Sequence, residues 1–137
     1  MEGVKWHGFL DKAQPDQRAL MTRLLRESCA LVLPSLYEPF GIAPVEAMLH
    51  GMPAIVSGEW ALGETVQHEV TGLHVRPGDA RSLQDALERL LVDVKFRQSL
   101  GARAATVAQE RFTWPRVVER LKVALEQMAK EPPLNSV

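Results

Sequence analysis

The sequence is poor in features that would place it in a specialised class of protein. It contains one cysteine, Cys29, among its 137 residues, so no disulfide can form within the chain. A small buried thiol at the end of a helical pattern is the role we expect for it. Basic and acidic residues nearly balance at a formal net charge of -1, which gives no electrostatic reason to expect a nucleic acid or a membrane surface as partner.

Long apolar segments are also lacking. No run approaches the roughly 20 residues that a membrane-spanning helix needs. Met1 is followed by Glu2 and Gly3 without the basic and apolar regions of a secretory leader. Internal repeats and low-complexity tracts do not occur. Together with the lone cysteine, these absences predict a soluble, untargeted chain in a reducing, cytoplasmic setting.

What the sequence does contain is an alternation of strand and helix patterns. Short apolar runs typical of strands occur at residues 4–8, 30–34, 53–57 and 72–75. The run at 30–34 has the continuous apolar character of a strand buried on both faces. Helical patterns occur at residues 15–29, 44–50, 64–67, 83–91, 100–110 and 114–128. This order predicts an α/β fold, a partial Rossmann-like open parallel sheet with helices on both faces.

Particular residues mark where helices begin and end. Pro15 and Pro44 suit first helical turns, Gly51 is a C-terminal stop, and Asp79 is expected to cap the helix that follows it. Thr113 opens the last helix, whose predicted inner stripe is Val117, Val118, Leu121, Leu125 and Met128. The chain is long enough for one core, so we expect one domain over residues 1–131 and a frayed tail at 132–137.

Two predicted loops lie where such a fold binds ligands. In open parallel sheets the ligand sits beyond the carboxyl ends of the strands, and residues 35–41 and 57–63 follow two of them. The first loop runs directly into a helix N-terminus, where unpaired N–H groups and the helix dipole favour a phosphate. Gly41 lets the backbone come close to such a ligand.

Glu38 and Glu46 are the candidate polar residues of this segment. A carboxylate can accept two hydroxyl hydrogen bonds from a ribose or a hexose, so the pair could hold different parts of one extended ligand. Their spacing fits equally well an exposed loop glutamate and a solvated charge near a helix N-terminus. From spacing alone, both interpretations stay open.

The same segment resembles a known signature. It is similar to the Glu-x7-Glu signature of the family-four glycosyltransferases, which are the retaining GT-B enzymes of the glycosyl transferases group 1 type. The matching residues are Pro34-Ser35, Glu38-x-Phe40-Gly41 and Glu46-Ala47-Met48-x-x-Gly51-x-Pro53. The resemblance extends to Val4–Gly8, Thr71-Gly72-Leu73, Pro77-Gly78-Asp79 and Phe112-Thr113-Trp114. It therefore covers nearly the whole chain and implies the C-terminal domain of a GT-B fold.

The resemblance implies a role for each matching residue. Glu38 would lie by the donor sugar hydroxyls as the catalytic residue, and Glu46 would bind the ribose. Phe40, Gly41 and Ile42 would present backbone amides to the donor diphosphate. The implied activity is hexosyl transfer from a nucleoside diphosphate sugar with retention of configuration, without a bound metal or other cofactor.

The chain departs from the family pattern in two ways. The second loop reads Gly58-Glu59-Trp60-Ala61-Leu62-Gly63-Glu64, so the usual Gly-Gly pair is absent and only Gly63 and Glu64 match as donor-binding residues. The family's upstream part is also absent, namely the first strands, the arginine and lysine that hold the diphosphate, and the N-terminal acceptor domain with its catalytic histidine. We therefore expect the isolated chain to be an incomplete, inactive enzyme.

Other conspicuous residues favour structural roles. His7, His50, His68 and His74 lack the spacing of metal ligands, and Trp60 is expected to pack on its own domain. Arg111, Arg116 and Arg120 form a basic stripe typical of a solvated face, although in the family this helix can cross back to the acceptor domain.

Two other functions stay open at this point. The chain could be a nucleotide-binding or regulatory remnant that works with a partner chain, or a GT-B relative such as a sugar-nucleotide epimerase. The absence of the early strands would leave an apolar sheet edge, which predicts self-association.

Overall fold

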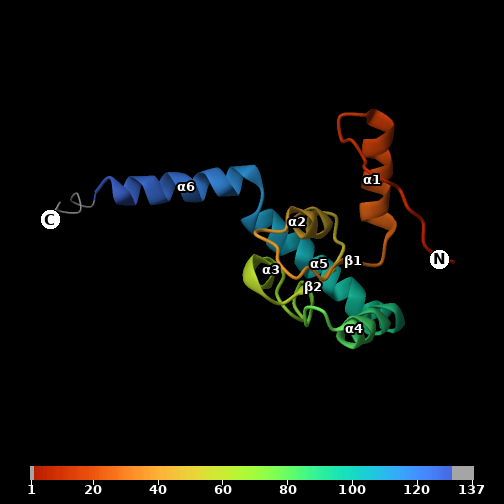
Figure 1. The fold of residues 1–137 in the computed structure, drawn as a ribbon. Coiled ribbons are helices and arrows are strands. Elements are labelled where there is room, and N and C mark those ends of the chain that lie inside the picture. The colour runs from red at the N-terminus through yellow and green to blue at the C-terminus, as the bar shows by residue number, and fades with distance from the viewer. Residues whose placement is uncertain (1, 131–137) are drawn as a thin grey trace.

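The structure, a computed structural model, describes residues 2–130, so the predicted tail at 132–137 lies outside the described residues. Helices and strands alternate in it as the sequence predicts (Figure 1). The elements are α1 (Pro15–Glu27), β1 (Leu31–Leu33), α2 (Ile42–Leu49), β2 (Ala54–Ser57), α3 (Trp60–Thr65), β3 (Gly72–Val75), α4 (Ala80–Val92), α5 (Val94–Arg111) and α6 (Trp114–Met128).

The strands form one parallel sheet in the order β1-β2-β3. Val32 pairs with Ile55, and Ile55 pairs with Leu73, so β2 is hydrogen-bonded on both sides. Every residue of β2 is buried. The central position of this strand accounts for its continuous apolar sequence.

Helices cover both faces of the sheet, which confirms the predicted α/β architecture. Ala54 and Val56 of β2 pack against α2, α3 and the second half of α5. Ile55, which lies between them, faces the other side and packs with Leu73 of β3 and with α4. The alternation of side chains along β2 thus supplies both halves of the core.

Helix α5 lies close against residues 51–53, the segment that joins α2 to β2. An added Cβ at Gly101 would overlap the carbonyl oxygen of Gly51, and it would lie 3.5 Å from Cδ of Pro53. Leu100 and Ala104, one on each side of this contact, belong to the two different core clusters. Gly101 therefore sets how closely α5 approaches the sheet.

The predicted strand at residues 4–8 is wrong. That segment has no regular secondary structure, and no described strand pairs with it. Trp6 and Phe9 are 90% and 91% exposed. An extended segment needs a neighbour for its N–H and C=O groups, and no described element provides one here.

Two burial predictions near this end are also wrong. Cys29 is exposed, because α1 has no buried residue and stands away from the sheet (Figure 1). The β1 strand is only partly buried, with Val32 39% exposed, because it is an edge strand among the described residues.

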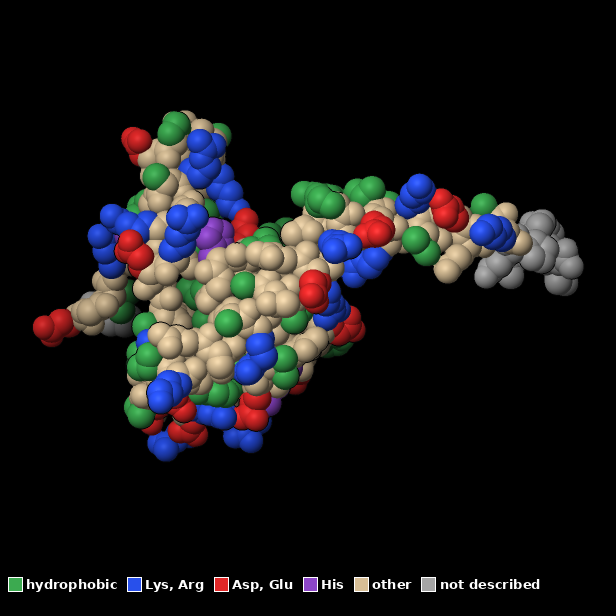
Figure 2. Space-filling view, turned by 180° about the vertical axis from the view of Figure 1, so that it is seen from behind, with side chains coloured by type: hydrophobic (Ala, Val, Ile, Leu, Met, Phe, Trp, Pro, Cys, Tyr) green, Lys and Arg blue, Asp and Glu red, His purple; other side chains and the backbone are tan. Residues whose placement is uncertain are grey.

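The inner stripe predicted for α6 is wrong as well. The helix exists, but none of its residues is buried, and it projects from the body of the molecule as an arm (Figures 1 and 2). Val118, Leu121, Leu125 and Met128 are exposed along it, and Val117 is only partly buried. A helical period shows which side chains share a face, but it does not provide a surface to cover them.

Two predicted helices begin four or more residues before their predicted first residue. The short helix expected at 64–67 spans Trp60–Thr65, so it begins directly after the second loop. The helix expected at 100–110 begins at Val94, because the carboxylate of Asp93 accepts a hydrogen bond from the Phe96 N–H at 2.8 Å and caps it. The predicted cap at Asp79 is confirmed, with the Ser82 N–H donating to its carboxylate at 3.0 Å.

Within residues 2–130, no helix combines the length and the apolar character required for crossing a lipid bilayer.

The contact at Gly101 yields a stability prediction. Gly101→Ala should lower the melting temperature, because the new methyl group forces α5 away from the Gly51 carbonyl and costs on the order of 1–3 kcal/mol of overpacking. Ala102→Ser, which adds an atom on the exposed face of the same helix, is the control and should melt close to the parent. Equal melting of the Gly101 variant and the parent would show that α5 is not held at this distance.

Candidate functional site

The first predicted loop runs from the end of β1 to the first turn of α2. Its start is tied to the sheet by the Ser57 hydroxyl, which donates to the Ser35 carbonyl at 2.6 Å. Its end is Gly41, the N-cap of α2, with a φ of 84°. An added Cβ there would lie 2.5 Å from Cδ2 of Leu62, so both the backbone conformation and the contact require glycine.

Glu38 folds back onto the helix that follows it. Its Oε1 accepts hydrogen bonds from the Gly41 N–H at 3.2 Å and from the Phe40 N–H at 3.4 Å. The carboxylate therefore occupies two of the three backbone donors that the sequence predicts for an anion. The third predicted donor is Ile42, and the side chains of Phe40 and Ile42 are both exposed.

Glu46 lies farther along α2, with a side chain that is 29% exposed. One of its carboxylate oxygens forms an ion pair with the Lys12 ammonium, which comes from the segment before α1. No sequence motif includes Lys12, which lies 34 positions before Glu46, so the pair could not be predicted from local patterns.

The two predicted loops meet at the carboxyl edge of the sheet. Gly41 of the first lies against Leu62 of the second, and the rings of Tyr37 and Trp60 lie edge to face at 5.8 Å between centroids. The Thr65 hydroxyl also lies 3.4 Å from the Phe40 carbonyl. Trp60 thus contacts its own domain as expected, although its side chain is 65% exposed.

The two donor residues predicted on the second loop lie within α3. Gly63 packs on the chain itself, since an added Cβ would lie 2.8 Å from the Gly58 carbonyl oxygen. Glu64 is exposed. No described hydrogen bond or ion pair joins either residue to Glu38 or Glu46, so the structure brings together the two loops but not all of the predicted side chains.

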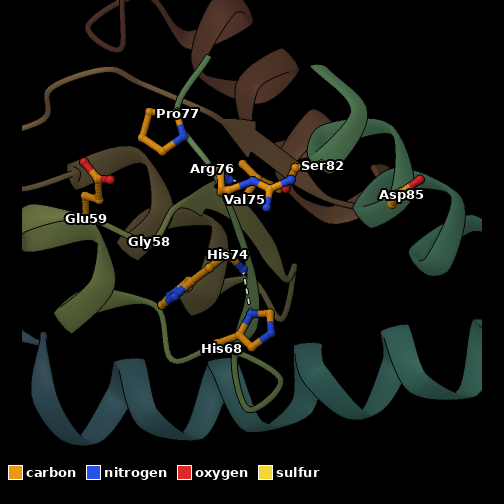
Figure 3. Close-up of a pocket in the computed structure, with 9 residues that line it drawn as sticks. All are labelled: Gly58, Glu59, His68, His74, Val75, Arg76, Pro77, Ser82 and Asp85. Atoms are coloured by element: carbon orange, nitrogen blue, oxygen red, sulfur yellow. Dashed lines mark hydrogen bonds between the residues drawn. The ribbon is translucent and has the colours of Figure 1, made fainter. Parts of the chain in front are cut away.

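A hollow that the sequence did not predict lies beyond the ends of β2 and β3, apart from the contacts between the two loops. It measures about 590 Å³ and is lined by Gly58, Glu59, His68, His74, Val75, Arg76, Pro77, Ser82 and Asp85 (Figure 3). The His74 backbone N–H donates to Nδ1 of His68 at 2.8 Å. In residues 2–130, no three side chains of histidine, cysteine, aspartate or glutamate are placed to hold a metal ion.

The family model for glycosyl transferases group 1 matches residues 2–107. The chain belongs to the group 1 glycosyltransferases. The Glu38 and Glu46 segment lies inside the match, so the predicted family is confirmed.

Curated relatives of this group 1 chain cover most of its length. An uncharacterized glycosyltransferase of Methanocaldococcus jannaschii is 33% identical over 114 residues, which are 80% of this chain and 29% of that protein. The glycogen synthase of Mycobacterium tuberculosis is 34% identical over 113 residues, 82% of this chain and 25% of the enzyme. The chain therefore spans only a quarter to a third of the length of these relatives.

A solved structure confirms the GT-B architecture. Anabaena HepE, in complex with UDP and glucose, matches with a TM-score of 0.71 and 25% identity, over 77% of this chain and 29% of that protein. The three-stranded sheet of this group 1 domain and its helices correspond to part of that fold.

Asp79 has two partners, Arg76 and Ser82, that line the hollow, and both lower the pKa of its carboxyl group. The Ser82 N–H, and after it the Arg76 guanidinium, hold the pKa of Asp79 below its usual 3.8. The ionised cap therefore stabilises the fold above pH 3.8, and this contribution is lost as the pH falls through the lower folded-state pKa.

We expect Asp79→Ala to reduce the melting temperature at pH 7, because the Ser82 amide loses its acceptor. The difference from the parent should shrink as the pH is lowered below 3.8, where the parent carboxylate becomes protonated. Asp79→Ser is the control, since its hydroxyl still caps the helix but does not titrate. A difference that stays constant from pH 7 to pH 2.5 would contradict the assigned pKa direction.

Proposed function

We propose that this chain forms the donor half of a glycosyltransferase site, which binds a nucleoside diphosphate sugar between the first loop and α2. The observation that carries the proposal is the pair of amides at Phe40 and Gly41, which hold a carboxylate oxygen at the start of a helix. A diphosphate oxygen has the same charge and needs the same donors. Glu46, which lies within that helix, supplies a second carboxylate besides that of Glu38 in the loop.

Glu38 occupies these amides in the structure. When a diphosphate takes its place, the carboxylate is released to accept hydrogen bonds from the sugar hydroxyls. Glu46 accepts hydrogen bonds from the ribose. Negative charge that develops on the departing nucleoside diphosphate is stabilised by the Phe40 and Gly41 amides and by the helix dipole.

The choice of ligand is supported by HepE, which has been solved with UDP and also with UDP-glucose. The proposal extends to hexosyl transfer with retention of configuration, without a bound metal, and to an acceptor domain outside this sequence. Because the chain spans 29% of HepE, we expect it to bind a donor without transferring the sugar alone.

Ligand-induced stabilisation tests nucleotide binding. Millimolar UDP, GDP or ADP should raise the melting temperature of the chain, because a ligand that binds only the folded state stabilises it. At ten times the dissociation constant, the rise should be roughly 4–6 °C for a domain of this size. Glu46→Ala should abolish the rise, and Glu110→Ala, on the exposed face of α5, should retain it. A cooperative transition with no rise for any of these nucleotides would overturn the proposal.

Glu38→Ala separates the two roles proposed for this residue. Removal of the carboxylate frees the Phe40 and Gly41 amides, so the affinity for UDP should be equal to that of the parent or higher. The additional stabilisation that UDP-glucose provides over UDP should disappear, because the acceptor for the sugar hydroxyls is gone. Calorimetric titration with both ligands measures this difference. An unchanged preference for UDP-glucose in the variant would place the sugar elsewhere.

A further inference from the structure

The part of the chain that contains both donor loops has no strong cation. No lysine or arginine occurs between Arg26 and Arg76. The glutamates of this stretch are Glu27, Glu38, Glu46, Glu59, Glu64 and Glu69. A helix N-terminus offers only about half of a positive charge. A diphosphate bound here would meet a surplus of negative charge unless another segment supplied a cation.

One cation from outside this stretch reaches the proposed donor site. The Lys12 ammonium pairs with the carboxylate of Glu46. Among the described residues, no other lysine or arginine forms an ion pair with α2 or with either loop. The Lys12 side chain remains 54% exposed, so it is accessible to a ligand.

The backbone around Lys12 is held in place by its neighbours. The Asp11 carboxylate accepts a hydrogen bond from the Ala13 N–H at 2.9 Å. The Asp11 N–H donates to the side-chain oxygen of Gln17 on α1 at 2.7 Å. The turn that carries Lys12 is therefore held against α1.

The Lys12 to Glu46 pair is also isolated in the fold. No other side-chain hydrogen bond in the described structure joins residues 2–29 to the rest of the chain. Helix α1 buries none of its residues, so apolar packing does not position this segment. The contact is thus one of charge with charge, and a bound ligand can rearrange it.

We propose that Lys12 is a further donor-binding residue, whose ammonium contacts the diphosphate of the nucleotide. The inference rests on the proposed function, and it adds the cation that the two loops lack. Glu46 follows Gly41 by five residues, a rise of roughly 7.5 Å along the helix. The flexible lysine side chain can cover that span by rotation about its methylene groups. When the Lys12 ammonium moves toward the phosphates, the Glu46 carboxylate is free to accept hydrogen bonds from the ribose hydroxyls.

A comparison of UDP with uridine tests this role. Uridine has the same base and ribose but no phosphate, so only UDP affinity should depend on Lys12. Lys12→Ala should weaken UDP binding about tenfold, the effect of losing one hydrogen bond between charged groups at an accessible site. Its uridine affinity should match that of the parent. Lys12→Arg should retain most of the UDP affinity, and Lys5→Ala, on the same exposed segment, should retain all of it.

The outcomes separate this inference from the proposed function. Equal UDP affinity of Lys12→Ala and the parent, with binding still lost in Glu46→Ala, overturns the role of Lys12 alone. Tighter binding of both UDP and uridine to Lys12→Ala also overturns it, since the lysine would then compete with the ribose for Glu46. A parent chain that binds no nucleoside diphosphate overturns the donor site and the lysine together. Far-ultraviolet circular dichroism of each variant excludes misfolding as the cause of a loss.

Discussion

Strand β2 is paired on both of its edges and buried on both of its faces, and the position of every loop at the candidate site depends on it. Its side chains alternate between two layers of helices, so Ala54 and Val56 anchor one layer while Ile55 anchors the other. Because its neighbours run parallel to it, the chain leaves all three strands at the same edge. The polar loops are gathered there as a consequence of strand direction.

Contacts that involve glycine and small side chains bring the two loops together at this edge. Gly41 lies against Leu62, and Ser35 is linked to Ser57 at the end of β2. These contacts place the first turn of α2 next to α3. The Phe40 and Gly41 amides that precede this turn donate to Glu38 at the edge of the sheet.

The charge of the site explains the internal contacts of its glutamates. With no lysine or arginine between Arg26 and Arg76, the glutamates there have few local partners. Glu38 accepts hydrogen bonds from backbone amides, and Glu46 pairs with a lysine from another segment. Both carboxylates are therefore satisfied by groups of the chain itself, and the proposed function requires a bound nucleotide to exchange these contacts.

The sequence by itself determined the alternation of elements, the two loops at the carboxyl edge, the Asp79 cap and the family, because each depends on residues close together in the chain. The strand at residues 4–8, the burial of Cys29 and the packing of α6 were predicted wrongly. Each of those depends on a partner surface, which a local pattern does not contain. For the same reason, only the tertiary structure showed that Lys12 pairs with Glu46 and that Glu38 accepts hydrogen bonds from the Phe40 and Gly41 amides before α2. A periodic pattern identifies the face that an element presents, but long-range packing and charge decide what that face meets.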